Sequence, residues 1–250
     1  MGYDFVLIFS YLKVGDLNKM SKKAMRIKLI IIIFIILLFI SIAVFFIYIN
    51  LKLHSQKVYT AKQLGITVIL SDYDIDGDGI DDYTDILQGA RQYIATKPRY
   101  ESKYYAGGYP DDGCGVCTDV IWKAYQSAGY NLKGLVDDDI RNNLNAYSTI
   151  VTPEPNIDFR RVKTLKTFFD RNSNSLSTDF SNPEEWQAGD IVIFSNHIAV
   201  CSDKRNSDGI PFIIHHDGLG AREVNEIKNY KIIGHYRLVL QSSIEKGPTE

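Results

Sequence analysis

The sequence predicts an α+β domain behind a single transmembrane helix, and three observations carry this prediction. Residues 29–49 form a run of 21 residues without a charge. Apolar residues then recur at helical spacing between residues 86 and 128. The last third of the chain instead contains β-branched and aromatic runs separated by turn residues. Helices followed by strands are typical of an α+β domain with an antiparallel sheet.

The apolar run 29–49 is long enough to cross a bilayer as a helix, for which about 20 residues suffice. It exceeds the roughly 7–15 apolar residues of a cleavable signal peptide, and no small-residue cleavage site follows it. Residues 1–28 carry a net charge of +4 and should therefore stay in the cytoplasm. We expect a single-pass signal anchor in the cell membrane, with the C-terminal domain extracellular.

Outside the apolar run, composition divides the chain into five parts. Because the whole chain has a net charge of −2, the residues after position 28 carry −6. A nucleic-acid binder would need the opposite charge on its folded part, so we exclude that class. The expected parts are a cytoplasmic tail or over-long start (1–28), a stalk (50–71), an acidic loop (72–85), the folded domain (86–240) and a C-terminal tail (241–250).

The acidic loop has the spacing of an EF-hand-type calcium loop. It holds seven aspartates in 14 positions, with Gly79 at the sixth position of the motif, where a sharp turn is needed. The twelfth position is Asp rather than Glu and no entering helix precedes the loop, so it resembles the loop-only calcium sites of extracellular proteins. The alternative is a solvated acidic linker. We expect a structural Ca²⁺ of modest affinity, with ligands Asp74, Asp76, Asp78, Asp82 and Asp85.

A nucleophilic thiol is predicted at Cys117, where a glycine-rich turn runs into a helix. A helix N-terminus and a neighbouring imidazolium can lower a thiol pKa from about 8.5 to about 3.5–7.5, which makes the thiolate the main species. The Cys117 N–H, unpaired in the first turn, can also donate to an oxyanion. A general base on a strand fits His197, and His215 on the following strand can orient it.

The order of several short motifs resembles that of NlpC-type papain-like cysteine peptidases. These motifs are Tyr-x-Gly-Gly, Cys-Thr-Asp-Val, Gly-Asp-Ile-Val-Ile-Phe, His-Ile-Ala-Val and Ile-Ile-His. The sequence is still more similar to a widespread bacterial domain of unassigned function that is usually grouped with these peptidases. That domain shares Asn-Ile-Asp-Phe-Arg-Arg-Val and Gly-His-Tyr-Arg with this chain, and the resemblance covers about residues 84–240.

The resemblance implies a papain-like fold in which Cys117 is the nucleophile, His197 the general base and His215 the orienting residue, with no cofactor for catalysis. It implies a hydrolase, a cysteine peptidase or amidase that cleaves an amide bond in peptidoglycan or another cell-surface substrate. The interval between the two histidines is longer than in NlpC-type enzymes.

Five further residues are expected to line the substrate site. Tyr104 or Tyr105 falls where a tyrosine often lines the NlpC-type site, and Asp119 stands where those enzymes carry Gly. Arg160 and Arg161 can clamp a substrate carboxylate, although a solvated face is an equally good interpretation.

Other chemistries remain open for the same residues. The scaffold also supports acyl transfer to an amine or alcohol. Cys114 and Cys117 can form a redox pair or a disulfide, or can join His197 and His215 in a Cys₂His₂ zinc site. A non-catalytic wall- or ligand-binding module, stabilised by calcium or zinc, is the alternative from a different class.

Overall fold

The computed structural model describes residues 22–54 and 57–239. The chain separates into two compact units, residues 1–55 and 56–250. In the first unit, helix α2 (Lys22–His54) begins before the predicted span and contains it. Within the described residues one helix, over Lys22–Ile49, is long and apolar enough to cross a membrane. Membrane anchors and signal sequences both have this property. The predicted C-terminal tail and residues 1–21 lie outside the described residues.

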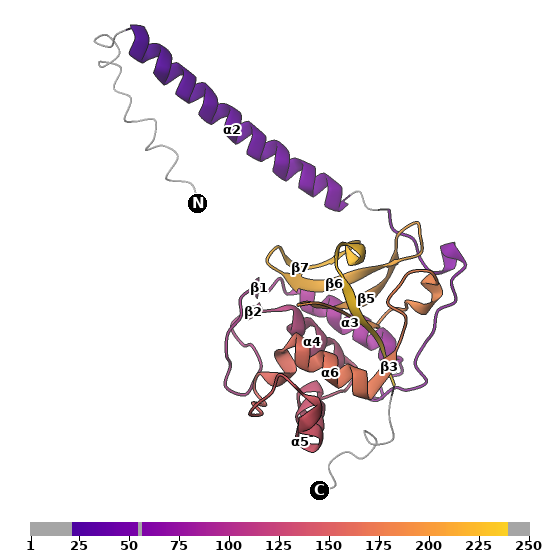
Figure 1. Ribbon diagram of the computed structural model, residues 1–250. Helices are drawn as coiled ribbons and strands as arrows, with labels where there is room; N and C mark the ends of the chain where they lie inside the picture. The colour runs from indigo at the N-terminus through magenta and orange to yellow at the C-terminus, as the bar shows by residue number, and fades with distance from the viewer. Residues whose placement is uncertain (1–21, 55–56, 240–250) are drawn as a thin grey trace. The chain divides into compact units, whose positions relative to one another are not determined.

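The helices of the second unit form a layer on one face of a β-sheet (Figure 1). Helix α3 starts where the side chain of Asp81 accepts hydrogen bonds from the N–H groups of Tyr83 and Thr84. Helix α4 ends before Gly129, whose φ of 79° closes the helix in the left-handed region. The four helices are α3 (Asp82–Ala95), α4 (Cys117–Ser127), α5 (Leu132–Asn143) and α6 (Val162–Asn172).

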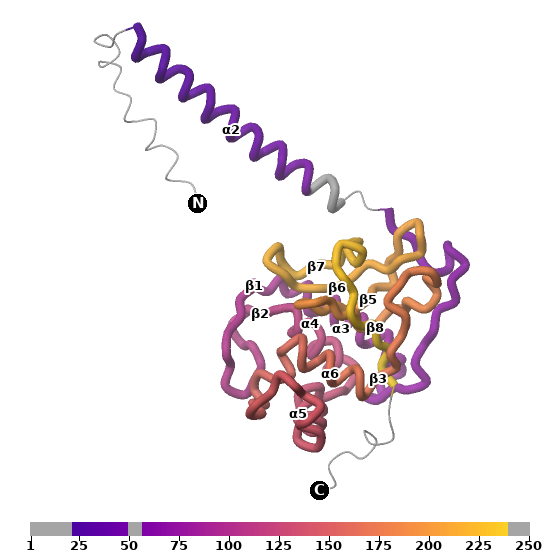
Figure 2. The backbone as a smooth tube through the Cα atoms, in the orientation of Figure 1, coloured from indigo at the N-terminus to yellow at the C-terminus, as the bar shows by residue number. Residues whose placement is uncertain are grey.

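The main sheet has six antiparallel strands in the order β3-β8-β4-β5-β6-β7. Figure 2 traces the backbone and labels all of these strands except β4. A separate parallel pair joins β1 to β2 beside the start of α4. The strands are β1 (Arg99–Tyr100), β2 (Cys114–Gly115), β3 (Ser173–Ser175), β4 (Ile191–Phe194), β5 (Ile198–Arg205), β6 (Pro211–Asp217), β7 (Gly220–Val224) and β8 (Ile232–Leu238). Short 3₁₀ helices span Lys62–Leu64, Leu144–Ala146, Asp158–Arg160, Pro183–Glu185 and Ile227–Asn229.

Each face of the sheet covers its own hydrophobic core. Ile198 and Ile214 point into the larger core beneath the helices, whereas Ala199 and Ile213 point into a smaller core built around Trp186. This alternation is the two-residue period of a strand. The α+β architecture with a C-terminal antiparallel sheet agrees with the sequence prediction.

The predicted stalk is wrong for residues 57–71, which lie against the folded unit. Tyr59 and Arg205 exchange two backbone hydrogen bonds of 2.8 and 2.9 Å. Further along, the Gln187 side chain donates to the carbonyl of Thr67 and accepts from the N–H of Ile69. These hydrogen bonds tie the segment to the sheet and to Gln187, so it is part of the folded unit rather than a stalk.

Candidate active site

Cys117 is the first residue of α4, and the acidic side chain of Asp119 caps the turn before it by accepting the N–H of Val116 at 2.7 Å. The thiol is buried, and burial raises its pKa to about 11. Hydrogen bonds to the sulfur from the backbone N–H groups of Ile198, Thr118 and Cys117 lower this pKa. The rise caused by burial is larger than their combined effect. Contrary to the expectation of a thiolate, the resting form at neutral pH is the thiol.

The structure joins His197 and His215 directly. His197 Nε2 lies 2.8 Å from His215 Nδ1, and the ring planes are nearly perpendicular at 81°. Burial is the main cause that lowers the pKa of both imidazoles, that of His197 to about 4. Both rings are therefore neutral at pH 7, and one ring donates a hydrogen bond that the other accepts. Among the described residues, His197 Nδ1 has no hydrogen-bond partner.

The Cys117 sulfur lies beside the strand residue that follows His197. The N–H of Ile198 lies against this sulfur on the helix-facing side of the sheet, whereas His215 shares the opposite face of β6 with Ile213. No hydrogen bond joins Cys117 to either imidazole within the part of the chain that the structure describes. His197 instead packs against the rings of Phe194 and Tyr230, with ring centroids 6.1 and 5.9 Å away. Hydrogen bonds between a catalytic thiol and its base are often long or unformed before substrate binds.

Asp119 and Arg160, both expected at the substrate site, form a buried ion pair with each other. Arg160 Nε and Nη2 lie 2.8 and 2.9 Å from the two oxygens of Asp119, and the two side chains are 3% and 1% exposed. Trp122 Nε1 also donates to the same carboxylate. The predicted role of Arg160 as a clamp for a substrate carboxylate is therefore wrong, because its fork already holds Asp119. The pair anchors the first turn of α4 beneath Cys117.

The other three predicted substrate residues lie apart from the histidine pair. Tyr105 is buried and donates to Asp112, while its ring lies 5.1 Å from the Arg160 guanidinium. Tyr104 is 58% exposed, and its hydroxyl bonds Glu154 and Asn156. Arg161 forms an ion pair with Asp158 at 2.7 Å. Tyr104 and Arg161 still offer exposed surface to a ligand, whereas Tyr105 supports the ion pair.

A second histidine cluster near Cys117 was not predicted. His216 lies on the opposite face of β6 from His215. Its Nδ1 forms a hydrogen bond of 2.8 Å with the hydroxyl of Tyr93. The ring of Tyr100 packs edge-on against the same imidazole. The pKa values of Tyr93 and Tyr100 are raised mainly by burial and also by the negative charge that Cys117 acquires as a thiolate. Strand alternation alone could have placed His216 on the helix-facing side.

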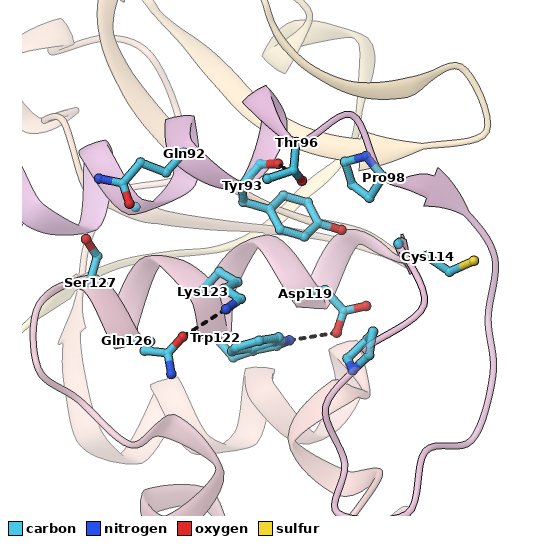
Figure 3. Close-up of a pocket in the computed structure, with 13 residues that line it drawn as sticks. Gln92, Tyr93, Thr96, Pro98, Cys114, Asp119, Trp122, Lys123, Gln126 and Ser127 are labelled. Atoms are coloured by element: carbon cyan, nitrogen blue, oxygen red, sulfur yellow. Dashed lines mark hydrogen bonds between the residues drawn. The ribbon is translucent and has the colours of Figure 1, made fainter.

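A pocket of about 370 Å³ lies between α3 and α4 (Figure 3). Tyr93, Asp119 and Trp122 line it, and the Cys114 sulfur is directed away from the indole of Trp122. Neither Cys117 nor the histidine pair lines this pocket. It therefore lies beside the candidate reaction centre rather than at it.

The acidic loop brings three of its five predicted ligands together. Oxygens of Asp74, Asp76 and Asp78 lie within 4.8 Å of one another. Asp82 is buried and bonds the Ile75 N–H and the Tyr130 hydroxyl, so its expected role as a ligand is wrong. Asp85 is buried in the first turn of α3, and its pKa is raised to about 6, first by burial and then by the neighbouring carboxylates.

The structure does not assemble the redox or zinc alternatives. All three cysteines are free thiols. Cys114 donates to Glu101 at 3.3 Å and lies 3.2 Å from the guanidinium of Arg99. In the described residues, the groups of side chains that can hold a metal include no cysteine or histidine.

Residues 87–238 match a family described as a domain of unknown function, DUF1287, and the chain belongs to this family. It is 38% identical over 164 residues to the uncharacterized protein YijF of Escherichia coli (strain K12), an alignment that covers 61% of this chain and 80% of that protein. No solved structure matches.

Proposed function

We propose that this protein is a membrane-anchored extracellular cysteine hydrolase with a papain-like, NlpC-type fold, which cleaves an amide bond in peptidoglycan. Cys117 is the nucleophile, His197 the general base and His215 the residue that orients the base. The single observation that carries the proposal is the contact of the Cys117 sulfur, at a helix start, with the N–H of Ile198, the residue that follows His197. A nucleophile, a base and an orienting group are the minimum set for this chemistry.

The tautomers follow from this assignment. For His197 to act as a base through Nδ1, its proton must sit on Nε2 and be donated to His215 Nδ1. His215 then carries its own proton on Nε2, a buried atom without a hydrogen-bond partner in the described residues. His215 is therefore an acceptor for His197 and fixes the direction in which the free nitrogen points.

The resting charges define the first step. A buried thiol with a pKa of about 11 and an imidazole with a pKa of about 4 stay neutral together. The proton therefore moves from Cys117 Sγ to His197 Nδ1 only as the sulfur attacks the substrate carbonyl carbon. The Cys117 N–H donates to the oxyanion that forms.

The second half of the cycle returns the proton. Imidazolium at His197 protonates the leaving amine as the C–N bond breaks, which leaves a thioester on Cys117. The neutral imidazole then removes a proton from water, whose oxygen attacks the thioester carbon. The C–S bond breaks, a carboxylic acid leaves, and the imidazolium returns its proton to the Cys117 sulfur. The net reaction adds one water to one amide, and the enzyme recovers its thiol.

The proposed location of the domain and its proposed substrate are supported by other observations. An apolar N-terminal helix preceded by basic residues favours an anchor with the domain outside the cytoplasm. Peptidoglycan is the amide-rich polymer on that side of a bacterial membrane, and the resemblance to NlpC-type peptidases motivates it as the substrate.

Digestion of purified peptidoglycan by the full chain in detergent tests the proposal. Wild type should release new amino and carboxyl termini, measured by mass spectrometry, and Cys117→Ala should release none. Cys114→Ala is the matched control, because Cys114 bonds Glu101 rather than the histidine pair, and should keep activity. Equal digestion by wild type and Cys117→Ala would refute the proposal.

A further inference from the structure

Three exposed carboxylates converge in the loop that precedes α3. The oxygens of Asp74, Asp76 and Asp78 lie within 4.8 Å of one another, and the backbone N–H groups of residues 77–80 donate hydrogen bonds to these carboxylates. Three negative charges at this spacing repel one another. Convergence alone does not make a site, so the loop needs an independent sign of a ligand.

That sign is the buried side chain of Asp85, the twelfth residue of the motif. Asp85 is 4% exposed, and its Oδ2 has no hydrogen-bond partner within the described residues. A buried, unpartnered carboxylate oxygen costs free energy unless something positive meets it. Asp85 lies in the first turn of α3, directly after the three converging side chains, at the motif position that supplies the last ligand in loops of this type.

The same loop is attached to the folded domain at two points. The hydroxyl of Tyr130 donates to Asp82, and the Ile75 N–H donates to the other oxygen of that carboxylate. Asp76 packs against Gly129 so closely that a Cβ there would come within 3.1 Å of the Asp76 side chain. The loop is thus held against the end of α4 with its three converging carboxylates exposed.

We propose that residues 72–85 bind one Ca²⁺ through the carboxylates of Asp74, Asp76, Asp78 and Asp85, and that this cation stabilises the loop against the domain. The loop lies before the residues that match the family, so the site is an addition to the family domain. It is independent of the thiol chemistry proposed for Cys117.

The donor set favours calcium. Every ligand is a hard oxygen, the class that Ca²⁺ and Mg²⁺ prefer over nitrogen or sulfur. Ca²⁺ takes six to eight oxygens in flexible geometry, which suits four carboxylates, a backbone carbonyl and water. Mg²⁺ demands a near-ideal octahedron and gives up its water reluctantly. We therefore expect an affinity for Ca²⁺ of about 10⁻⁴–10⁻³ M, in the range of extracellular modules.

Thermal unfolding of the full chain in detergent, after chelation and removal of the chelator, tests the site with Ca²⁺ alone. At 10 mM Ca²⁺, Tm should rise by about 3–10 °C, which is the mass-action effect of that affinity on a unit of this size. Mg²⁺ at the same concentration should give less than a third of that shift. No rise in Tm with Ca²⁺, and no heat of binding by calorimetry, would overturn the proposal.

Two variants separate binding from folding. Asp85→Asn removes a buried negative charge, so without calcium this variant should be at least as stable as wild type, yet its midpoint for Ca²⁺ should rise tenfold or more. Asp76→Asn changes an exposed side chain that the core does not need, and should weaken binding similarly.

Asp111→Asn is the charge-matched control, since Asp111 is an exposed aspartate outside the loop, and should keep the wild-type midpoint. A wild-type midpoint in both loop variants would overturn the assignment of ligands. So would an equal loss in the Asp111 variant, because a general charge effect would then explain the response.

Discussion

His197 Nε2 lies 2.8 Å from His215 Nδ1, and within residues 22–54 and 57–239 no hydrogen bond engages the other nitrogen of His197. If His215 acts as an acceptor, an amide oxygen in the same place should serve as well. Asn carries its Oδ1 at the position of the histidine Nδ1, and the Cys-His-Asn arrangement is a known variant of this catalytic set.

We therefore expect His215→Asn to keep activity within about tenfold of wild type, and His215→Ala to lower kcat by on the order of 10²-fold. Peptidoglycan digestion rates of both variants measure this. An equal loss in the two variants would show that His215 does not act through its acceptor nitrogen.

The buried pair of Asp119 and Arg160 should dominate the stability of the α4 start. Asp119→Ala leaves a buried guanidinium without its partner, and we expect a loss of about 3–5 kcal/mol in the free energy of unfolding. Urea unfolding followed by tryptophan fluorescence measures it, because both tryptophans, Trp122 and Trp186, lie in the second unit.

Asp137→Ala is the control for that substitution. Asp137 pairs with Arg141, whose side chain is 64% exposed, so the loss should stay below about 1 kcal/mol. Similar losses in the Asp119 and Asp137 variants would contradict the importance of the buried pair.

Acid should destabilise the fold through His197. Burial lowers the pKa of His197 from an ordinary 6.5 to about 4, so the unfolded chain takes up a proton at a higher pH than the folded chain. Stability is therefore unaffected above pH 6.5 and falls as the pH drops from 6.5 towards 4. His197→Gln removes this loss, so the Tm of wild type should fall more steeply than that of the variant across this range. Parallel curves would contradict a neutral, buried imidazole.

The buried thiol should alkylate slowly at neutral pH. Because burial raises the pKa of Cys117 to about 11, its labelling by iodoacetamide should keep increasing up to the highest pH at which the fold survives. Mass spectrometry of the labelled peptide separates Cys117 from Cys114 and Cys201. Half-maximal labelling of Cys117 below pH 8 would instead show a stable thiolate–imidazolium pair.

Helices and strands whose apolar residues recur at a regular spacing could be predicted from the sequence. Apolar spacing between residues 86 and 128 predicted the helical region that holds α3 and α4, and the β-branched runs of the last third predicted the antiparallel sheet. Strand β7, with the sequence Gly-Ala-Arg-Glu-Val, was missed because it lies at the sheet edge and shows no apolar alternation.

Long-range polar partners could not be predicted in the same way. Asp119 and Arg160 lie 41 residues apart, and no local pattern states that two charges will meet in a core. The sequence therefore suggested substrate contacts where the structure has an internal ion pair. The prediction of a lowered pKa for the Cys117 thiol was wrong for a related reason. The helix N-terminus could be predicted, but the burial whose effect on the pKa is larger could not.

Intact-mass spectrometry of the full chain, quenched with acid during turnover of peptidoglycan fragments, tests the central claim most directly. The account predicts a covalent acyl adduct on Cys117 in wild type, lost on treatment with hydroxylamine and absent from Cys117→Ala. Cleavage of the substrate without any adduct on Cys117, at a rate that Cys117→Ala reproduces, would contradict it.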